Sequence, residues 1–280
     1  MQTSAGKTTK RSLRFSLFVF CQLFLLNLPN SAHPSPQNKP PLIQICIIID
    51  DMGYAIKSAE KFINLPFDLT LAIIPFSPYS KRVAYLAHHH QKEVMLHAPM
   101  ETLAETKWED GLTSDMQENE LVARVDEMLF DIPFAVGLNN HGGSKLTQQK
   151  QHMDWLMSWA AQRQLFFIDS RTTAASVAAE AAKQAIVPYQ QRDVFLDNSK
   201  DPSDIKNQLN KLIAIASKQG HAIGIGHPYA ETFAVLKEEL PKLQQQGIRL
   251  TTVSNLVFND LNQPRLFLSQ QPGASFTDLK

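Results

Sequence analysis

Acidic residues and histidines follow almost every short apolar run of this 280-residue chain. They are the pair Asp50 and Asp51, then His97, His141, Asp169, Asp197 and His227. One carboxylate and two or three imidazoles from separate segments can hold a divalent metal with an open coordination position, as catalytic zinc requires. A second carboxylate can take a proton from the water that the metal activates, and another histidine can protonate a leaving group. These residue types therefore predict metal-assisted hydrolysis of an amide or an ester.

Each of these residues also has a structural alternative. Asp50 and Asp51 could cap the N-terminus of a following helix, because aspartate is a common N-cap residue, and Asp169 could do the same. His97 and His141 could be ordinary hydrogen-bonded loop histidines. The joint occurrence of all these residues at the ends of successive apolar runs favours a functional site.

The elements that must position these side chains alternate between two types. Short apolar runs, which predict strands, lie at residues 42–50, 69–75, 93–97, 134–138, 165–169, 193–197, 221–226 and 248–253. Amphipathic stretches, which predict helices, lie at 54–64, 79–91, 117–131, 147–163, 173–185, 202–219 and 231–246. Nearly continuous apolar strands separated by helices favour a parallel sheet that is covered on both faces. Seven to eight such units predict an α/β fold of the irregular (β/α) barrel type.

In such a barrel the carboxyl ends of the strands meet at one rim, where functional side chains gather. The acids and histidines follow predicted strands, so we expect them at that rim. Five polar residues near the same strand ends are expected to orient the substrate: Asn140, Ser144, Asp169, Arg171 and Asp197.

The first 32 residues have the layout of a secretory signal peptide. They contain four basic residues and no acidic one, then an apolar run from Phe15 to Leu28 and the small residues Ser31 and Ala32. The apolar run is short for a membrane span, and an uncleaved anchor is the alternative. Residues 33–41 form a Pro-rich linker, residues 42–260 the barrel domain and residues 261–280 a C-terminal tail. We therefore expect a periplasmic protein with no stable membrane insertion after signal cleavage.

The charge and cysteine content of the chain argue against a nucleic-acid-binding protein and against a disulfide-bonded one. The chain has 27 basic and 27 acidic residues, so it lacks the basic surplus that nucleic-acid binding needs. Removal of Cys21 with the signal peptide leaves Cys46 as the only cysteine, which excludes an internal disulfide. Cys46 lies in an apolar run and is typical of a buried thiol. No pattern in the sequence indicates an oligomeric state.

Seven segments of the chain resemble motifs of the divergent polysaccharide deacetylase family of bacterial envelope proteins. They are IIIDDMGY, LTLAIIPFSPYS, EVMLHAPME, GLNNHGGSKLT, FFIDSRTT, VFLDN and AIGIGHPYAETF, and they occur in the family's order. The resemblance extends from about Leu42 to Val257. It implies a distorted (β/α) barrel that uses a divalent metal, with zinc as the expected ion, to remove acetyl groups from a polysaccharide or another acetylated glycan.

The resemblance also implies a role for single residues. Asp50 corresponds to the family's catalytic base, Asp51 to a metal ligand and His227 to the general acid. The implied enzyme is a hydrolase that acts on carbon–nitrogen bonds other than peptide bonds. Trp108, in a long loop after the third strand, could stack on a sugar ring or pack the loop onto the barrel.

The histidine motif departs from the family pattern. Ordinary members carry two metal-binding histidines four residues apart, whereas here Glu101 stands four residues after His97 and Lys145 four residues after His141. A metal site would therefore combine His97 and His141, from two separate segments, with Asp51. The departure motivates a second hypothesis, a catalytically inactive carbohydrate-binding or envelope-organising protein on the same fold.

Overall fold

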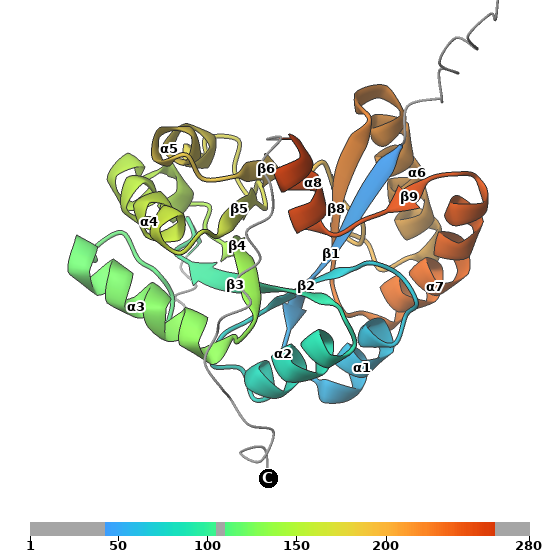
Figure 1. Cartoon of the computed structure of the whole chain (residues 1–280), viewed down its shortest axis with the longest axis horizontal. Helices are drawn as coiled ribbons and strands as arrows, with labels where there is room; N and C mark the ends of the chain where they lie inside the picture. The colour runs from blue at the N-terminus through green and yellow to red at the C-terminus, as the bar shows by residue number, and fades with distance from the viewer. Residues whose placement is uncertain (1–42, 105–109, 261–280) are drawn as a thin grey trace, which may run out of the picture. The chain divides into compact units, whose positions relative to one another are not determined.

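The computed structural model of the chain describes residues 43–104 and 110–260, and Figure 1 shows their arrangement. The predicted signal peptide 1–32, the linker 33–41 and the tail 261–280 lie outside these residues, and so does Trp108. Within the described ranges, no helix combines the length and the apolar character that crossing a membrane requires.

The described residues contain nine parallel strands in one curled sheet. They are β1 (Gln44–Met52), β2 (Thr70–Ile73), β3 (Glu93–Met100), β4 (Ala135–Gly142), β5 (Phe166–Asp169), β6 (Tyr189–Gln191), β7 (Val194–Phe195), β8 (His221–Gly226) and β9 (Arg249–Leu250). Eight of them are ordered β6-β5-β4-β3-β2-β1-β8-β7, and β9 pairs with the first residues of β1. This is the order of a (β/α) barrel that stays open between β6 and β7, so the predicted irregular barrel is confirmed.

Two adjacent residues explain where the barrel opens. The backbone N–H of Arg192 donates to Asp169 on β5, whereas the backbone N–H of Asp193 donates to Ile223 on β8. The chain thus passes from one edge of the sheet to the other without an intervening helix. The prediction placed one strand at 193–197 and missed β6, because β6 is short and its residues Tyr189–Gln191 are polar.

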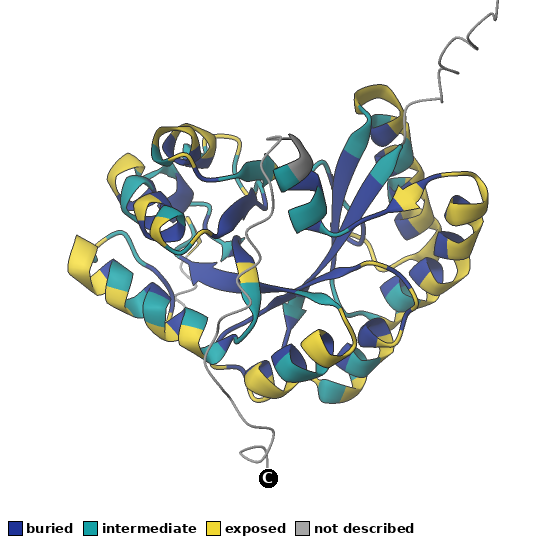
Figure 2. Cartoon of the chain, viewed as in Figure 1, coloured by how far each residue is buried: buried dark blue, intermediate teal, exposed yellow. Residues whose placement is uncertain are grey.

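Seven helices cover the outer face of the sheet. They are α1 (Ile56–Ile63), α2 (Ser80–His89), α3 (Glu118–Asp131), α4 (Lys150–Gln162), α5 (Ala178–Ala185), α6 (Pro202–Gln219) and α7 (Ala230–Gln245), with a short 3-10 helix η1 (Leu146–Gln148) before α4. Each lies within or beside a predicted amphipathic stretch. Figure 2 shows their buried sides against the strands and their exposed sides turned outward, as a helix with one apolar stripe requires.

The strands separate two layers of apolar side chains, because successive residues of a strand point to opposite faces. On β1, Ile45, Ile47 and Ile49 belong to the core between the sheet and the outer helices, whereas Cys46 and Ile48 belong to a second cluster on the inner face. Cys46 is fully buried there, as predicted for an inert thiol.

An eighth helix, α8 (Val253–Asp260), was not predicted and packs on the inner face. Its residues Val253, Leu256 and Val257 complete the inner apolar cluster. The first turn of α8 is held by the partly buried Glu93, whose carboxylate accepts the backbone N–H of Ser254 at 3.1 Å. Since Glu93 begins β3, α8 lies toward the amino ends of the strands and leaves their carboxyl ends for polar residues.

Candidate metal centre

The inner face of the sheet changes from apolar to polar along the strands. On each of four strands, inward-facing apolar residues are followed by one polar residue. The apolar residues are Cys46 and Ile48 on β1, Met95 on β3, Phe166 and Ile168 on β5, and Ile223 and Ile225 on β8. The polar residues that follow them are Asp50, His97, Ser170 and His227. Because the strands are parallel, the polar ends of these rows meet at one rim. The predicted strand-end residues His97 and His141 lie inside β3 and β4, which extend further than predicted.

A backbone irregularity brings both aspartates of β1 to this rim. In a regular strand, Asp50 and Asp51 would point to opposite faces. The register of β1 against β2 shifts between Ile49 and Met52, and Asp51 has a positive φ of 55°, which turns its side chain back toward the site. The capping alternative for this pair is wrong, because α1 begins after Ala55 without a side-chain cap.

Three ligand atoms form a small triangle at the rim. Asp51 Oδ1 lies 2.9 Å from His141 Nδ1 and 3.2 Å from His97 Nε2, and the two nitrogens are 3.1 Å apart. Atoms that share one zinc ion at ~2.1 Å stand about 3.0–3.4 Å apart, so the spacing fits a common ion. Asp51 Oδ1 is also buried and, among the described residues, has no hydrogen bond of acceptable geometry. The donor set and the unsatisfied oxygen both fit a divalent metal.

Asn139, which the sequence analysis did not single out, orients two members of the site. Its Oδ1 accepts the hydrogen of His97 Nδ1 at 2.7 Å, which leaves the lone pair of His97 Nε2 directed at the triangle. Its Nδ2 donates to Asp50 Oδ1 at 2.9 Å. The alternation that turns His141 inward turns Asn139 inward as well, so the strand pattern held a signal for this residue.

The pKa values of the two neighbouring aspartates, Asp50 and Asp51, are shifted in opposite directions. Burial raises the pKa of Asp50, and the charge of His97 and the hydrogen bond from Asn139 offset this effect only in part. Burial would also raise the pKa of Asp51, but His141 and His97 beside it hold that pKa far below its ordinary value. Asp51 therefore stays a carboxylate, whereas Asp50 takes up a proton more readily than an exposed aspartate.

His227 faces the triangle from the opposite side. Its Nε2 lies 4.0 Å from Asp51 Oδ2, and its Nδ1 donates to Asp197 Oδ1 at 2.8 Å. Asp197 also accepts the backbone N–H of His227 at 2.6 Å and the hydroxyl of Thr232 at 2.7 Å. Burial lowers the pKa of His227, but the hydrogen bond and charge of Asp197 outweigh burial and raise it. Asp197 is buried, and its hydrogen bonds position His227; its predicted role in orienting the substrate stays a prediction.

The other predicted orienting residues have contacts within the protein. Asn140 accepts the backbone N–H of Ser170 and donates to the carbonyl of Gly142, so it orders two rim loops. Ser144 Oγ accepts the backbone N–H of Leu103 at 2.9 Å. These contacts support the rim loops, and the substrate-orienting role of Asn140 and Ser144 stays a prediction.

Asp169 ends β5, and Arg171 lies in the loop that follows. Asp169 is buried, and its carboxylate accepts the backbone N–H of Arg171 at 2.7 Å and the hydroxyl of Tyr189. The capping alternative for Asp169 is wrong, because α5 begins after Val177 without a side-chain cap. Arg171 has a positive φ of 52° and is partly exposed.

The residues at the positions of the missing second histidines pair with each other. Lys145 Nζ donates to Glu101 Oε1 at 2.7 Å, and Glu101 Oε2 accepts the backbone N–H of Ser114 at 2.8 Å. Burial would raise the pKa of Glu101, but these contacts lower it to about 2. An ion pair between the loops after β3 and β4 therefore joins the two sequence positions at which the family motif would place a second histidine.

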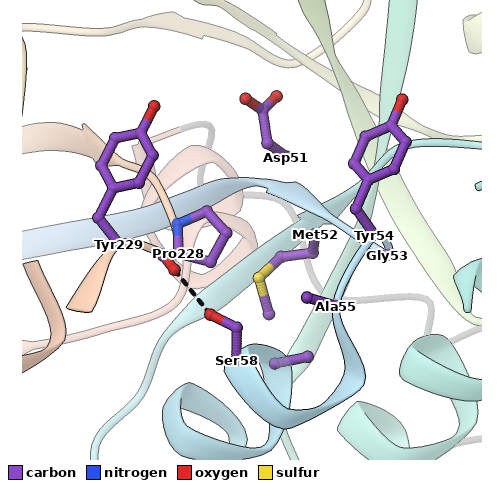
Figure 3. Close-up of a pocket in the computed structure, with 9 residues that line it drawn as sticks. Asp51, Met52, Gly53, Tyr54, Ala55, Ser58, Pro228 and Tyr229 are labelled. Carbon is purple, nitrogen blue, oxygen red and sulfur yellow. Dashed lines mark hydrogen bonds between the residues drawn. The ribbon is translucent and has the colours of Figure 1, made fainter.

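A cavity of about 220 Å³ opens beside Asp51, between the loop after β1 and the loop after β8. Figure 3 shows Tyr54 and Tyr229 on either side of Asp51, with Ala55, Ser58 and Pro228 below. Ser58 donates to the Pro228 carbonyl at 2.6 Å and joins the two loops. The cavity is smaller than the ~300–1,000 Å³ of pockets that hold drug-sized ligands, so it has room for one ring-sized group.

An open (β/α) barrel with a candidate His/Asp metal centre at its carboxyl rim defines a deacetylase-like α/β protein. The chain belongs to the divergent polysaccharide deacetylase family, whose model matches residues 47–257. The family predicted from the sequence motifs is therefore confirmed.

Two relatives and one solved structure are similar to this chain. An uncharacterized protein of Haemophilus influenzae is 36% identical over 218 residues, which are 78% of each chain. The uncharacterized protein YibQ of Escherichia coli is 33% identical over 236 residues, 84% of this chain and 72% of that protein. The crystal structure of an uncharacterized protein from Agrobacterium tumefaciens has the same fold, with a TM-score of 0.74 and 23% identity over 76% of this chain and 89% of that one.

Proposed function

We propose that the protein is a periplasmic, zinc-dependent hydrolase that removes acetyl groups from an envelope carbohydrate. The triangle of Asp51 Oδ1, His97 Nε2 and His141 Nδ1 carries the proposal, because its atoms lie 2.9–3.2 Å apart at the rim. Membership of the divergent polysaccharide deacetylase family supports acetylated glycans as the substrate class.

Asp51, His97 and His141 would hold the metal. When bound there, the ion supplies polarisation of the acyl carbonyl and activation of the attacking water. Asp50 lies at the edge of this centre, with Oδ2 3.6 Å from His97 Nε2. Asn139 holds Asp50 Oδ1, so Oδ2 is the oxygen that takes the proton from water, and the raised pKa of Asp50 suits a general base.

His227 is placed to complete the reaction. Asp197 accepts the hydrogen of His227 Nδ1 and favours the protonated ring, so Nε2 carries the proton that faces the site. As the bond between the acyl carbon and the sugar nitrogen breaks, His227 Nε2 gives this proton to the leaving amine. The water proton goes to Asp50, and the acyl group leaves as acetate.

The periplasmic location is proposed from the N-terminal segment. Its basic residues, its apolar run from Phe15 to Leu28 and the small residues Ser31 and Ala32 support export through a cleaved signal peptide. Cell fractionation of the tagged protein, with N-terminal sequencing of the mature form, tests this part of the proposal. A protein retained in the cytoplasm with an intact N-terminus would contradict it.

Acetate release tests the reaction. The zinc-loaded protein is expected to release acetate from an N-acetylated glycan, and chelation is expected to abolish release. Asp50→Asn removes the base but no metal ligand, so we expect activity to fall by about 10²–10⁴-fold with the zinc content unchanged. Asp154→Asn, which changes an aspartate of α4 on the outer layer, is the matched control and should keep wild-type activity.

The same assay decides between the two hypotheses of the sequence analysis. A fully loaded wild-type protein that releases no acetate from N-acetylated or O-acetylated glycans would contradict the hydrolase. Glycan binding that persists after chelation and in Asp50→Asn would then support the inactive carbohydrate-binding protein.

A further inference from the structure

The opening of the barrel between β6 and β7 separates two halves of the candidate centre. These strands are the two ends of the sheet order, and the two residues Arg192 and Asp193 connect them. On the β6 side of the opening lie β4 and β3, which carry Asn139 and His97, and on the β7 side lies β8, which His227 follows. In a closed barrel, hydrogen bonds between the two end strands would hold these sides together. A contact across the opening is therefore needed to fix the two halves.

The side chain of Arg192 holds the β5 side of the opening. Its Nε donates to the carbonyl of Ser170 at 2.8 Å, and its Nη2 donates to the carbonyl of Arg171 at 3.2 Å. Arg171 has a left-handed backbone conformation, which a residue with a side chain adopts only where its surroundings impose it. Asp169 accepts the N–H of Arg171 and Arg192 binds its carbonyl, so the guanidinium is one of the groups that fix this turn.

The turn after β5 is bonded to the first half of the centre. Ser170 Oγ accepts a hydrogen from Asn139 Nδ2 at 3.3 Å. The same Nδ2 also donates to Asp50, and the oxygen of that amide accepts the hydrogen of His97 Nδ1. A single side chain, Asn139, therefore separates the turn that Arg192 holds from both Asp50 and His97.

The face of the same guanidinium covers an aromatic ring on the β7 side. The central carbon of the Arg192 guanidinium lies 3.7 Å from the centroid of the Phe195 ring. That ring is stacked on the His227 imidazole, with 6.2 Å between the centroids and 23° between the planes. Phe195 also packs against the inner apolar cluster. Arg192 thus contacts both sides of the opening, and each contact continues to one half of the centre.

The chemistry of the side chain explains why an arginine stands here. A planar guanidinium can donate to two carbonyls while its face stacks on an aromatic ring, whereas a lysine ammonium cannot do both. Burial lowers the pKa of Arg192, and the charges of Asp169, Asp193 and Asp50 offset this effect only in part. A guanidinium nevertheless keeps its proton in proteins, so all of its donors are present.

We propose that Arg192 is a positioning residue that closes the barrel between β6 and β7 and fixes the two halves of the candidate centre relative to each other. It acts through the turn after β5 on one side and through Phe195 on the other. The effect on position follows from the contacts alone, whereas the effect on acetate release rests on the proposed function. Without the guanidinium, the two sides should move apart, so that Asp50 and His227 no longer face the same substrate bond.

The NMR signals of the histidine rings measure the two halves without any need for activity. The probe is the purified protein with isotope-labelled histidine after chelation of metal, with His97 and His227 assigned from His→Gln variants. In Arg192→Lys we expect the ring signals of both histidines to shift, because lysine cannot hold the two carbonyls and the Phe195 ring together. The signal of His152, which lies in α4 on the outer layer, should stay in place.

Two further variants separate positioning from a folding defect. Arg163→Lys is the matched control, because it removes a guanidinium that stacks on Trp159 just after α4, and it should leave the signals of His97 and His227 and acetate release unchanged. Arg192→Ala empties the place of the side chain. Millimolar guanidinium ion should then return both signals toward their wild-type positions, and ammonium ion at the same concentration should not.

Steady-state kinetics with an acetylated glycan measure the consequence for the reaction. Arg192→Lys should lower kcat by about 10–100-fold and change KM by less than about threefold, because misplaced groups slow the chemical step more than they weaken binding. The zinc content should not change. A raised KM with an unchanged kcat would assign Arg192 to substrate binding and would overturn the positioning role.

The outcomes separate the positioning role from the reaction. Arg192→Lys spectra in which His97 and His227 keep their wild-type signals, or in which only one of them shifts, would overturn the role. Arg192→Ala spectra that guanidinium ion does not restore would overturn it as well. Shifts of both signals in a protein whose wild type releases no acetate would support the role of Arg192 and contradict only the hydrolase.

Discussion

Two histidines that face Asp51 are oriented through the same ring nitrogen but by different partners. On the β3–β4 side, His97 Nδ1 donates to the amide oxygen of Asn139 at 2.7 Å. On the β7–β8 side, His227 Nδ1 donates to the carboxylate of Asp197 at 2.8 Å. The first partner is neutral and the second carries a negative charge, although the bond lengths are nearly equal.

The difference shows how one rim can hold a metal ligand and a proton donor. A neutral acceptor fixes the tautomer of His97 and leaves its Nε2 lone pair for a metal. A buried carboxylate also stabilises the charged ring, so it favours the protonated form of His227. Burial lowers the pKa of His97, but Asp50 and Asp51 raise it overall, so protons compete with the metal and metal affinity should fall as the pH falls.

Of the two partners, the neutral one is expected to have the greater effect when it is removed. Asn139→Ala leaves the His97 tautomer free, so we expect zinc affinity to fall by about 10–100-fold. Asn140→Ala, which changes the next residue of β4, should lower stability without changing zinc affinity by more than about threefold. Competition with a chromogenic chelator measures both affinities. Equal zinc affinities in the two variants would show that Asn139 does not orient His97 for metal binding.

Replacement of the charged partner should act on the pH profile. Asp197 raises the pKa of His227, so in Asp197→Asn the ring loses its proton at lower pH. The alkaline limb of the kcat/KM profile should therefore move to lower pH, with up to about tenfold less activity above neutral pH. The zinc content should not change, since Asp197 does not contact the triangle. A profile whose alkaline limb stays in place would show that His227 is not the acid.

The smallest effect concerns the ion pair between the loops of β3 and β4. Contacts with Lys145 and Ser114 lower the pKa of Glu101 to about 2, so they stabilise the fold above the ordinary pKa of glutamate. That contribution is lost as the pH falls toward 2. Because the pair is partly exposed, Glu101→Gln should reduce the free energy of unfolding by only about 0.2–1 kcal/mol at pH 7. Urea titrations at pH 7 and pH 3 measure the difference, and an equal or larger loss at pH 3 would contradict this sign.

The fold was largely predictable because most strands are apolar and most helices amphipathic. The exceptions are β6, whose residues Tyr189–Gln191 are polar, and α8, an eight-residue helix that follows the last predicted strand. The role of α8 depends on Glu93 and on the inner apolar cluster, which only the folded chain brings together. Local patterns do not report such distant contacts.

The residues of the candidate site could be predicted from the sequence, but the directions of their side chains and their contacts could not. Strand ends located Asp51, His97 and His141 at one rim. The turn at Asp51 depends on a positive φ and a shift of strand register, which residue type does not reveal. Asn139 and Asn140 are identical in type, and only the direction of each side chain shows which one touches His97.

The metal content of the protein tests whether Asp51, His97 and His141 hold an ion. Elemental analysis of the purified protein, beside Asp51→Asn and His141→Ala, measures whether the triangle holds an ion. We expect near-stoichiometric zinc or another divalent metal in the wild type and loss of the metal in both variants. A wild-type protein that stays metal-free after reconstitution, or variants that keep tightly bound zinc, would contradict the assignment of Asp51, His97 and His141 as ligands.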